Sequence, residues 1–106
     1  MKNNKPERPL FVPLKTEFFA AFLDGSKTTE FRQYGPRWNE NTCRPGRRVV
    51  LSRGYGKHHR LGGVVVGFEK KWTASAAWLN CYGAPGWAAC IEIELDSSTA
   101  ENKNPG

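Results

Sequence analysis

The clearest pattern of apolar and polar residues lies near the end of the chain. Between residues 87 and 95 every odd position is apolar, whereas the even positions include two glutamates. This period of two is typical of a strand with one buried face. Residues 61–70 are rich in valine and predict a second strand, in which three glycines favour a bulge or a bend. Shorter apolar runs predict further strands at residues 10–14, from the 24–32 segment to about Tyr34, and at 47–53.

Two short segments have the spacing of amphipathic helices. In residues 16–23 the apolar side chains fall on one stripe, which we expect to face the core, and these side chains are Phe18, Phe19, Phe22 and Leu23. Thr16 is a candidate N-cap of this helix, and Gly25 supplies the left-handed residue that ends it. A second helix has Thr73 as its candidate cap and ends at Gly83.

These elements predict one small domain of the mainly β, α+β class. Five to six short strands with two short helices between them are typical of a small, mostly antiparallel β-barrel. The 106 residues suffice for one domain with a modest core. We expect the domain to span residues 10–95, between a flexible tail at 1–9 and a disordered tail at 96–106. The sequence predicts neither a membrane span nor secretion, because it has no long apolar run and no apolar signal core.

The charge of the chain is unevenly distributed. Its formal net charge is +6, which suits a polyanionic partner. Residues 41–68 contain no Asp or Glu, although they carry arginines, a lysine and both histidines. A segment of one sign attracts phosphates irrespective of base sequence, and aromatic residues interleaved with it favour nucleic-acid contact. The alternative is a solvated basic surface that keeps the protein soluble.

Cysteine and histidine spacing predicts neither a disulfide framework nor a metal site. Cys43, Cys81 and Cys90 include no C-x-x-C pair, so we expect reduced thiols in a cytoplasmic protein. His58 and His59 are adjacent and would point to opposite faces of a strand, which is unsuited to joint metal binding. We therefore expect no metal and no cofactor, while a lone catalytic histidine stays an open alternative.

Residues 24–32, D-G-S-K-T-T-E-F-R, place three ionisable side chains just after the glycine turn. Side chains alternate along a strand, so Glu30 and Arg32 share one face while Phe31 takes the other. We expect Phe31 to be anchored in the core and the Glu30–Arg32 pair to face away from it, with Lys27 at the turn. Such a pair on a solvated strand is weak and needs no function, and a binding role is the alternative.

Two loops combine aromatic and basic side chains. Residues 35–41 hold Arg37 and Trp38, which predict either an exposed platform for stacking a base or a lid folded over the core. Residues 54–60, G-Y-G-K-H-H-R, combine glycines that permit close backbone approach with donors that suit phosphate. Together with the preceding strand end, this loop supplies the candidate contacts Arg53, Tyr55, Lys57, His58 and Arg60.

The run G-S-K-T-T-E-F-R resembles the G-x-K-x-x-E-x-R signature of ASCH domains, a branch of the PUA-like β-barrel superfamily. The segment R-P-G-R-R-V-V-L-S and the order of the elements resemble that family as well. The resemblance implies a small PUA-like barrel with a cleft beside the motif strand that takes RNA, a nucleotide or a modified nucleoside. It also implies that the lysine, glutamate and arginine of the signature correspond to Lys27, Glu30 and Arg32.

The main hypothesis is a nucleic-acid-binding module, with RNA favoured over DNA. We expect its cleft to hold single-stranded nucleic acid or a nucleotide, with Glu30 orienting Arg32 or accepting from a base edge. Phosphate contacts are expected from Lys27, Arg32, Arg53, Lys57 and Arg60, and base stacking from Tyr55 or Trp38, with Arg37 and His58 beside them. The hypothesis requires residues 27–32 and the 54–60 loop to converge on one hollow.

Some ASCH-like proteins are hydrolases, so the resemblance also implies an enzymatic alternative. A metal-independent hydrolase would use Lys27, Glu30 and Tyr55, acting on RNA as a ribonuclease or on a modified nucleoside such as N4-acetylcytidine. The amidohydrolase pattern has threonine where this chain has Glu30, so the hydroxyl would have to come from Thr28 or Thr29. A third alternative is a protein-interaction domain whose basic face meets an acidic partner. The sequence leaves the oligomeric state open.

Overall fold

A computed structural model describes residues 7–96 of the chain and contains five strands and two helices in that range. The elements in chain order are β1 (Leu10–Leu14), α1 (Thr16–Leu23), β2 (Thr29–Gln33), β3 (Arg48–Arg53), β4 (Arg60–Thr73), α2 (Ala76–Tyr82) and β5 (Gly86–Leu95). The mainly β fold with two short helices is therefore confirmed. Within the described range, neither helix has the length and apolar character needed to cross a bilayer.

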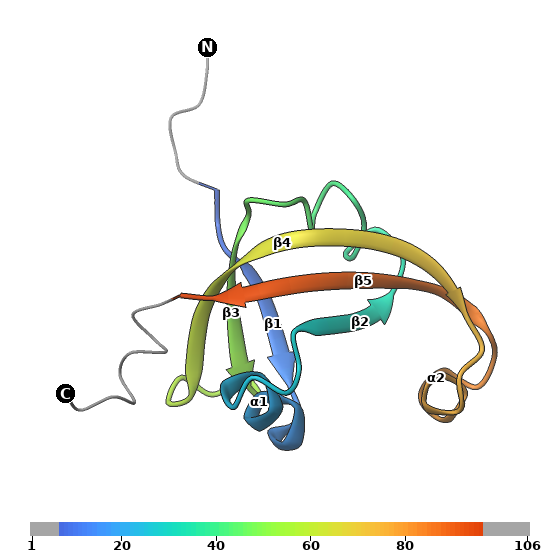
Figure 1. Cartoon of the computed structure of the whole chain (residues 1–106), viewed down its shortest axis with the longest axis horizontal. Helices are drawn as coiled ribbons and strands as arrows, with labels where there is room; N and C mark the ends of the chain where they lie inside the picture. The colour runs from blue at the N-terminus through green and yellow to red at the C-terminus, as the bar shows by residue number, and fades with distance from the viewer. Residues whose placement is uncertain (1–6, 97–106) are drawn as a thin grey trace, which may run out of the picture.

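The strands form one mixed sheet in the order β1-β3-β4-β5-β2 (Figure 1). The β1–β3 pair is parallel, and the three other pairs are antiparallel. β1 and β2 are the two edges of the sheet and are not hydrogen-bonded to each other as strands. The predicted closure into a barrel is therefore not confirmed.

The longest part of the sheet is the β4–β5 hairpin, whose strands have 14 and 10 residues. Figure 1 shows this hairpin arching past the other strands and carrying α2 at its far end. A register shift between Val65 and Gly67 leaves Val66 as the extra residue, which turns Val66 to the surface while Val65 stays buried. The strand also continues to Thr73, beyond its predicted end.

The main core lies between the sheet and α1. α1 contacts β1 and β3, and its Phe19 and Phe22 are buried, whereas Phe18 and Leu23 are exposed. The predicted apolar stripe is thus only half in the core. A separate small cluster joins Trp78 of α2 to Ala88 and Cys90 of β5. The buried members of the main core are Leu10, Val12, Leu14, Phe19, Phe22, Trp38, Cys43, Val49, Leu51, Leu61, Val65, Ala89, Ile91 and Ile93.

The glycines predicted the C-terminal ends of both helices correctly, whereas the threonines did not predict the N-caps. Gly25 and Gly83 have φ values of 87° and 84°, so both predicted left-handed helix stops are confirmed. The N-cap of α1 is Lys15, which makes no side-chain cap bond, and the predicted cap at Thr16 is wrong. At α2, Ser75 accepts the cap hydrogen bond from the Trp78 backbone amide, two residues after the predicted Thr73.

Most of the two predicted tails lies outside the described residues. The described ends are attached to the domain: Arg44 donates to Glu7, and the Arg8 carbonyl accepts from Arg47. At the other end Asp96 pairs with Arg48, and its backbone amide donates to the Gly62 carbonyl. Glu7, Arg8 and Asp96, which lie just outside the predicted limits of 10–95, are therefore in contact with the domain.

Gly63 is a position where the hairpin requires the absence of a side chain. A Cβ added there would lie 2.6 Å from the backbone oxygen of Glu94, on the paired strand. We expect Gly63→Ala to lower the free energy of unfolding by about 2 kcal/mol, because the strands must separate locally. Urea denaturation checks this, with Gly56→Ala as the control, since its Cβ would meet no atom within 4 Å. Equal stability of the two variants would contradict the close packing.

Candidate functional site

Lys27, Glu30 and Arg32 meet at the start of β2. Glu30 is 6% exposed, and each of its carboxylate oxygens faces one cation. Oε1 lies 3.5 Å from the Lys27 Nζ atom, and Oε2 accepts a hydrogen bond of 2.7 Å from the Arg32 Nε atom. The predicted grouping of Lys27, Glu30 and Arg32 is therefore present as an ion triad around one buried carboxylate.

The orientation predicted for this strand is reversed. Phe31, expected in the core, is 52% exposed, whereas Glu30 is buried. The register explains this: Glu30 and Arg32 pair with the core residues Ile91 and Ala89, and Phe31 pairs with Cys90 on the other face of β5. The sheet thus buries the Glu30 carboxylate at its β2 edge with each of its oxygens paired to a cation.

Lys27 is enclosed by aromatic rings as well as by oxygen atoms. Its Nζ atom lies 5.3 Å from the ring centroids of Phe18 and Phe31 and 5.6 Å from that of Phe22. The same atom donates a hydrogen bond of 2.7 Å to the Thr29 carbonyl. Ring faces, a carbonyl and a carboxylate all attract a positive charge. The Lys27 ammonium is therefore held in place by these rings and oxygen atoms.

Arg32 connects the two edges of the sheet. From β2, its guanidinium donates a hydrogen bond of 2.5 Å to the carbonyl of Pro13 on β1. The guanidinium carbon also lies 4.8 Å from the Trp38 ring centroid. With the bond to Glu30, these contacts occupy most of the side chain. Arg32 therefore joins two strands that share no backbone hydrogen bonds, and it offers little of its surface to a ligand.

Trp38 belongs to the core. It is 9% exposed and contacts the main apolar cluster, so of the two predicted roles the lid over the core is confirmed. A ring buried in this way has no face for a stacked base, and the stacking role is wrong. Arg37 lies on the same ring, with its guanidinium carbon 5.2 Å from the centroid.

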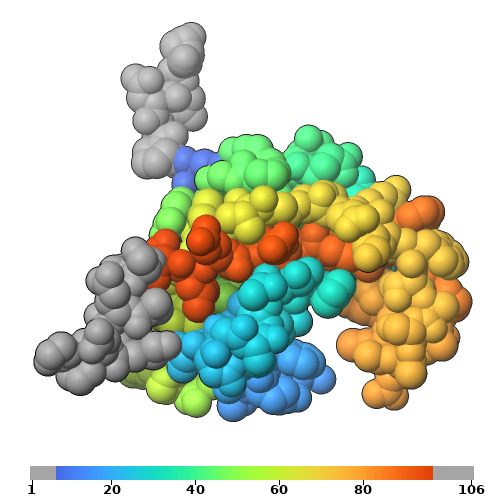
Figure 2. Space-filling view, viewed as in Figure 1, coloured from blue at the N-terminus to red at the C-terminus, as the bar shows by residue number. Residues whose placement is uncertain are grey.

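A cavity of about 550 Å³ opens between β2 and α2. Figure 2 shows the molecule hollowed between the α1–β2 part, in blue and cyan, and the α2 part, in orange. The lining comes from α1, the 24–32 segment, the far end of the hairpin and α2. Its residues are Phe18, Lys27, Glu30, Phe31, Lys71, Trp72, Thr73, Ser75, Ala77, Trp78, Cys81, Tyr82, Ala88 and Cys90.

The cavity combines aromatic walls with two lysines. Five of its lining residues are aromatic, and Lys27 and Lys71 contribute ammonium groups from different elements. The Trp78 ring is held by a hydrogen bond of 3.1 Å from its Nε1 atom to the Ala84 carbonyl. Burial raises the pKa of the Cys90 thiol, and the nearby charge of Lys71 opposes that rise. Cys81, in contrast, is exposed at the same cavity.

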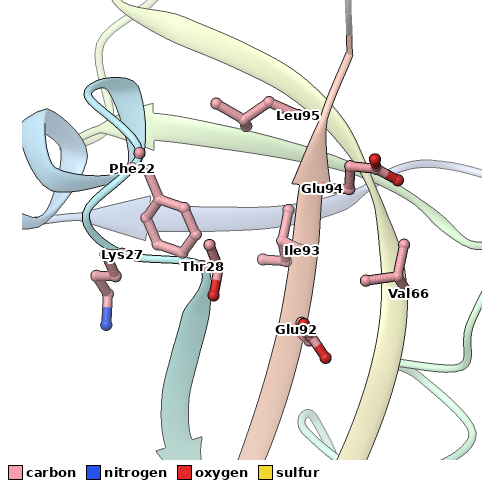
Figure 3. Close-up of a pocket in the computed structure, with 9 residues that line it drawn as sticks. Phe22, Lys27, Thr28, Val66, Glu92, Ile93, Glu94 and Leu95 are labelled. Carbon is pink, nitrogen blue, oxygen red and sulfur yellow. The ribbon is translucent and has the colours of Figure 1, made fainter.

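A second cavity, of about 450 Å³, lies between the α1–β2 turn and the β4–β5 pair (Figure 3). Figure 3 shows Phe22, Lys27 and Thr28 on one side and Ile93 of β5 on the other. Glu92 and Glu94 also line this space. Two carboxylates against one ammonium disfavour a phosphate, so the β2–α2 cavity is the better candidate for an anionic ligand.

The 54–60 loop does not reach the β2–α2 cavity. Tyr55 is 79% exposed and its ring centroid lies 6.1 Å from that of Phe11 on β1. The Arg60 guanidinium carbon lies 5.2 Å from the same Phe11 ring, and none of the residues 53–60 lines the cavity. The expected convergence of residues 27–32 with this loop on one hollow is therefore wrong. Tyr55 also lies outside the cavity that Lys27 and Glu30 line, so that cavity does not gather the three residues of the hydrolase alternative.

The basic segment 41–68 is partly neutralised by acids from distant parts of the chain. Glu7 pairs with Arg44 and Arg47, and Asp96 pairs with Arg48. The hydrogen bonds from these arginines lower the pKa values of Glu7 and Asp96. Arg53, Lys57, His58 and Arg60 are exposed, and none of them forms an ion pair with any residue in the described range.

Sequence reasoning missed most of the cavity. No candidate site residue was predicted among those after Arg60, although the cavity depends on Lys71, Trp72, Trp78 and Tyr82. The signal available was the aromatic spacing in K-K-W-T-A-S-A-A-W-L-N-C-Y, which is also typical of a helix stripe facing a core. Within residues 7–96, no three His, Cys, Asp or Glu side chains gather as a metal site requires.

Comparisons with known proteins add no identification to this geometry. No protein-family model and no curated protein sequence matches this chain.

Proposed function

We propose that this chain is a single-stranded nucleic-acid-binding module of the ASCH type, with RNA favoured over DNA. The observation that carries the proposal is the β2–α2 cavity, because its aromatic walls and two lysines suit a base and its phosphate. Its volume of about 550 Å³ lies within the range of small-ligand sites. One nucleotide of the strand occupies the cavity.

The residues of the cavity take distinct roles in this proposal. Phe18, Phe31 and Trp72 offer ring surface to the base, whereas Lys27 and Lys71 hold the phosphate from different walls. Glu30 fixes Lys27 and does not itself contact the ligand, because both of its oxygens are engaged within the triad. The site is therefore supported by the triad, without the triad being the binding surface.

In this proposal the 54–60 loop contributes to binding through its positive electrostatic field. Arg53, Lys57 and Arg60 have no carboxylate partner within the described range, so their charges attract phosphate at a distance. Tyr55, beside Phe11, gives the same surface an exposed ring. A cytoplasmic location also belongs to the proposal, and the free thiols of Cys43, Cys81 and Cys90 support it.

The test measures binding and occupancy of the cavity together. We expect a labelled oligo(rU) to bind with an affinity that falls as salt rises, because lysine–phosphate contacts release counterions. Lys71→Gln should weaken binding about fivefold, whereas Lys15→Gln, a surface lysine outside the cavity, should change it less than about twofold. Fluorescence anisotropy across a salt series checks both variants. Affinity that ignores salt would contradict the proposal.

Alkylation of Cys81 reports on the cavity directly. Cys81 is exposed at the cavity, whereas Cys43 and Cys90 are buried, so iodoacetamide should modify Cys81 first. We expect saturating RNA to slow this modification at least about fivefold, because a bound nucleotide covers the thiol. Mass spectrometry of the modified peptide provides the measurement. Unchanged alkylation with RNA bound would place the ligand elsewhere, and turnover of RNA or N4-acetylcytidine would favour a hydrolase.

A further inference from the structure

Two half-exposed tryptophans face one another on the far part of the β4–β5 hairpin. Trp72 and Trp87 are paired in the register, 58% and 47% exposed, and their ring centroids lie 5.3 Å apart in an edge-to-face arrangement. Neither ring belongs to an apolar core cluster. Exposed aromatic area that stabilises no core is typical of an interaction surface.

A lysine lies among the rings of this surface. The Nζ atom of Lys70 is 4.8 Å from the Trp87 ring centroid and 4.2 Å from that of Tyr34. Tyr34 is itself held in place, because its hydroxyl is hydrogen-bonded to the Glu40 carboxylate, a bond that lowers the pKa of Glu40. We call Tyr34, Lys70, Trp72 and Trp87 the hairpin strip.

The hairpin strip meets the β2–α2 cavity at Trp72. Trp72 belongs to both, since it lines the cavity and contacts Trp87. The rest of the strip lies on the opposite face of the hairpin from the cavity residues Lys71 and Ala88, because side chains alternate along both strands. A strand that leaves the cavity past Trp72 therefore turns around the edge of β4, which has no β3 partner beyond Val64, and meets Trp87 and the Lys70 ammonium on the other face.

We propose that the hairpin strip binds the nucleotides that flank the one in the cavity, so that the ligand is a single-stranded oligonucleotide and not a mononucleotide. This proposal rests on the proposed function of the cavity. Trp72 and Trp87 stack two successive bases, which is possible for any base because each has a π-face. Lys70 contacts the phosphate between them.

Charge favours nucleic acid over an apolar protein surface as the occupant. A cation interleaved with ring faces suits a ligand that alternates bases with phosphates. A purely apolar partner would bury the Lys70 ammonium, at a cost in solvation free energy. The net charge of +6 acts in the same direction at longer range.

The experiment compares ligand length with strip variants. Mononucleotide UMP and oligo(rU) of three, six and nine nucleotides are titrated against the full chain, with UMP occupancy followed by protection of Cys81. For the wild type we expect affinity to rise at least about tenfold from UMP to the hexamer. Trp87→Ala should weaken hexamer binding about tenfold and change UMP occupancy less than about twofold.

Lys70→Gln is the second variant, and it leaves both tryptophans in place. We expect about a threefold loss of hexamer affinity and a salt dependence shallower by about one phosphate contact. The matched controls are Leu79→Ala, an exposed apolar side chain on α2 outside the cavity lining, and Lys15→Gln. Each control should bind the hexamer within about twofold of the wild type. Thermal unfolding confirms that every variant is folded.

The outcomes separate the strip from the cavity. If UMP protects Cys81 but affinity does not rise with length, or if both strip variants bind the hexamer like the wild type, the strip proposal is overturned and the cavity function stands. If the wild type binds neither UMP nor any oligonucleotide, both fail. A protein captured from nuclease-treated extract in a Trp87-dependent manner, with normal hexamer binding, would also overturn the proposal in favour of a protein partner.

Discussion

Glu30→Gln is expected to lower the free energy of unfolding by about 3 kcal/mol, one of the two largest effects in this chain. The substitution leaves Lys27 and Arg32 facing each other across a neutral amide, within a site where the carboxylate is only 8% exposed. Removing one partner of a buried ion cluster is strongly destabilising, because the remaining charges stay desolvated without compensation. Both cations are about one-fifth exposed, so water recovers part of the loss.

The measurement is urea denaturation of Glu30→Gln beside a matched control. Glu92→Gln removes the same charge from the neighbouring strand β5, where Glu92 is exposed and paired in register with Thr29. We expect its effect to stay within about 0.5 kcal/mol. A triple variant with methionine at Lys27, Glu30 and Arg32 should recover much of the loss, since apolar groups of similar volume often replace buried ion clusters. Equal stability of Glu30→Gln and the wild type would contradict the buried triad.

The stability role of Glu30 limits its use as a functional probe. A variant that unfolds loses every activity, so lost RNA binding by Glu30→Gln would not locate the ligand. Lys71, Cys81 and Trp87 are better probes, because none of them belongs to the main core cluster. The triad and the cavity share Lys27 and Glu30. Glu30→Gln tests the contribution of the triad to stability, whereas Lys71→Gln and the alkylation of Cys81 test binding in the cavity.

The elements could be predicted from the sequence because their signals are local. The limits of β1 and α1 follow from short apolar runs bounded by proline, charge and glycine, and the Gly25 and Gly83 stops follow from the left-handed conformation that only glycine adopts easily. The sheet order places β1 beside β3 and β2 beside β5. No local pattern encodes that order, because it depends on pairings between residues far apart in the chain.

The candidate site could be predicted only in part, for the same reason. The grouping of Lys27, Glu30 and Arg32 was visible in the motif, but the face they occupy was not. Alternation fixes which side chains share a face, and only the partner strand decides which face is buried. Here β2 lies beside β5 with Phe31 opposite Cys90, and the exposed Phe31 ring becomes part of a cavity wall.

The positive charge predicted for the 41–68 segment is too high, because acids distant in the sequence pair with some of its arginines. The run 41–68 contains no acid, yet Arg44, Arg47 and Arg48 all pair with Glu7 or Asp96. Each of these pairs joins residues at least 37 positions apart in the sequence. The acid of each pair lies near one end of the described range. The net charge of a segment therefore overestimates its local field, and the unpaired basic surface of the described range is confined to fewer residues than the sequence indicates.

Trp38→Ala is expected to lower the free energy of unfolding by about 4 kcal/mol, the largest loss for any single substitution considered. The indole is 9% exposed within the main core, and its removal leaves a cavity that the surrounding side chains fill only partly. The Arg32 guanidinium, which joins the two sheet edges, loses the ring on which it lies. Urea denaturation of the wild type and the variant provides the difference.

Two further variants separate a core tryptophan from a base-stacking one. Trp38→Phe keeps a ring against Arg32 and should lose only about 1–2 kcal/mol, with hexamer binding within about twofold of the wild type. Trp87→Ala removes a half-exposed indole and should lose less than about 1 kcal/mol while weakening hexamer binding about tenfold. We therefore expect substitutions at Trp38 to change mainly the stability of the protein and substitutions at Trp87 to change mainly its affinity for the hexamer. If Trp38→Ala had the stability of the wild type but bound RNA more weakly, this prediction would be contradicted, and Trp38 would be the residue that stacks a base.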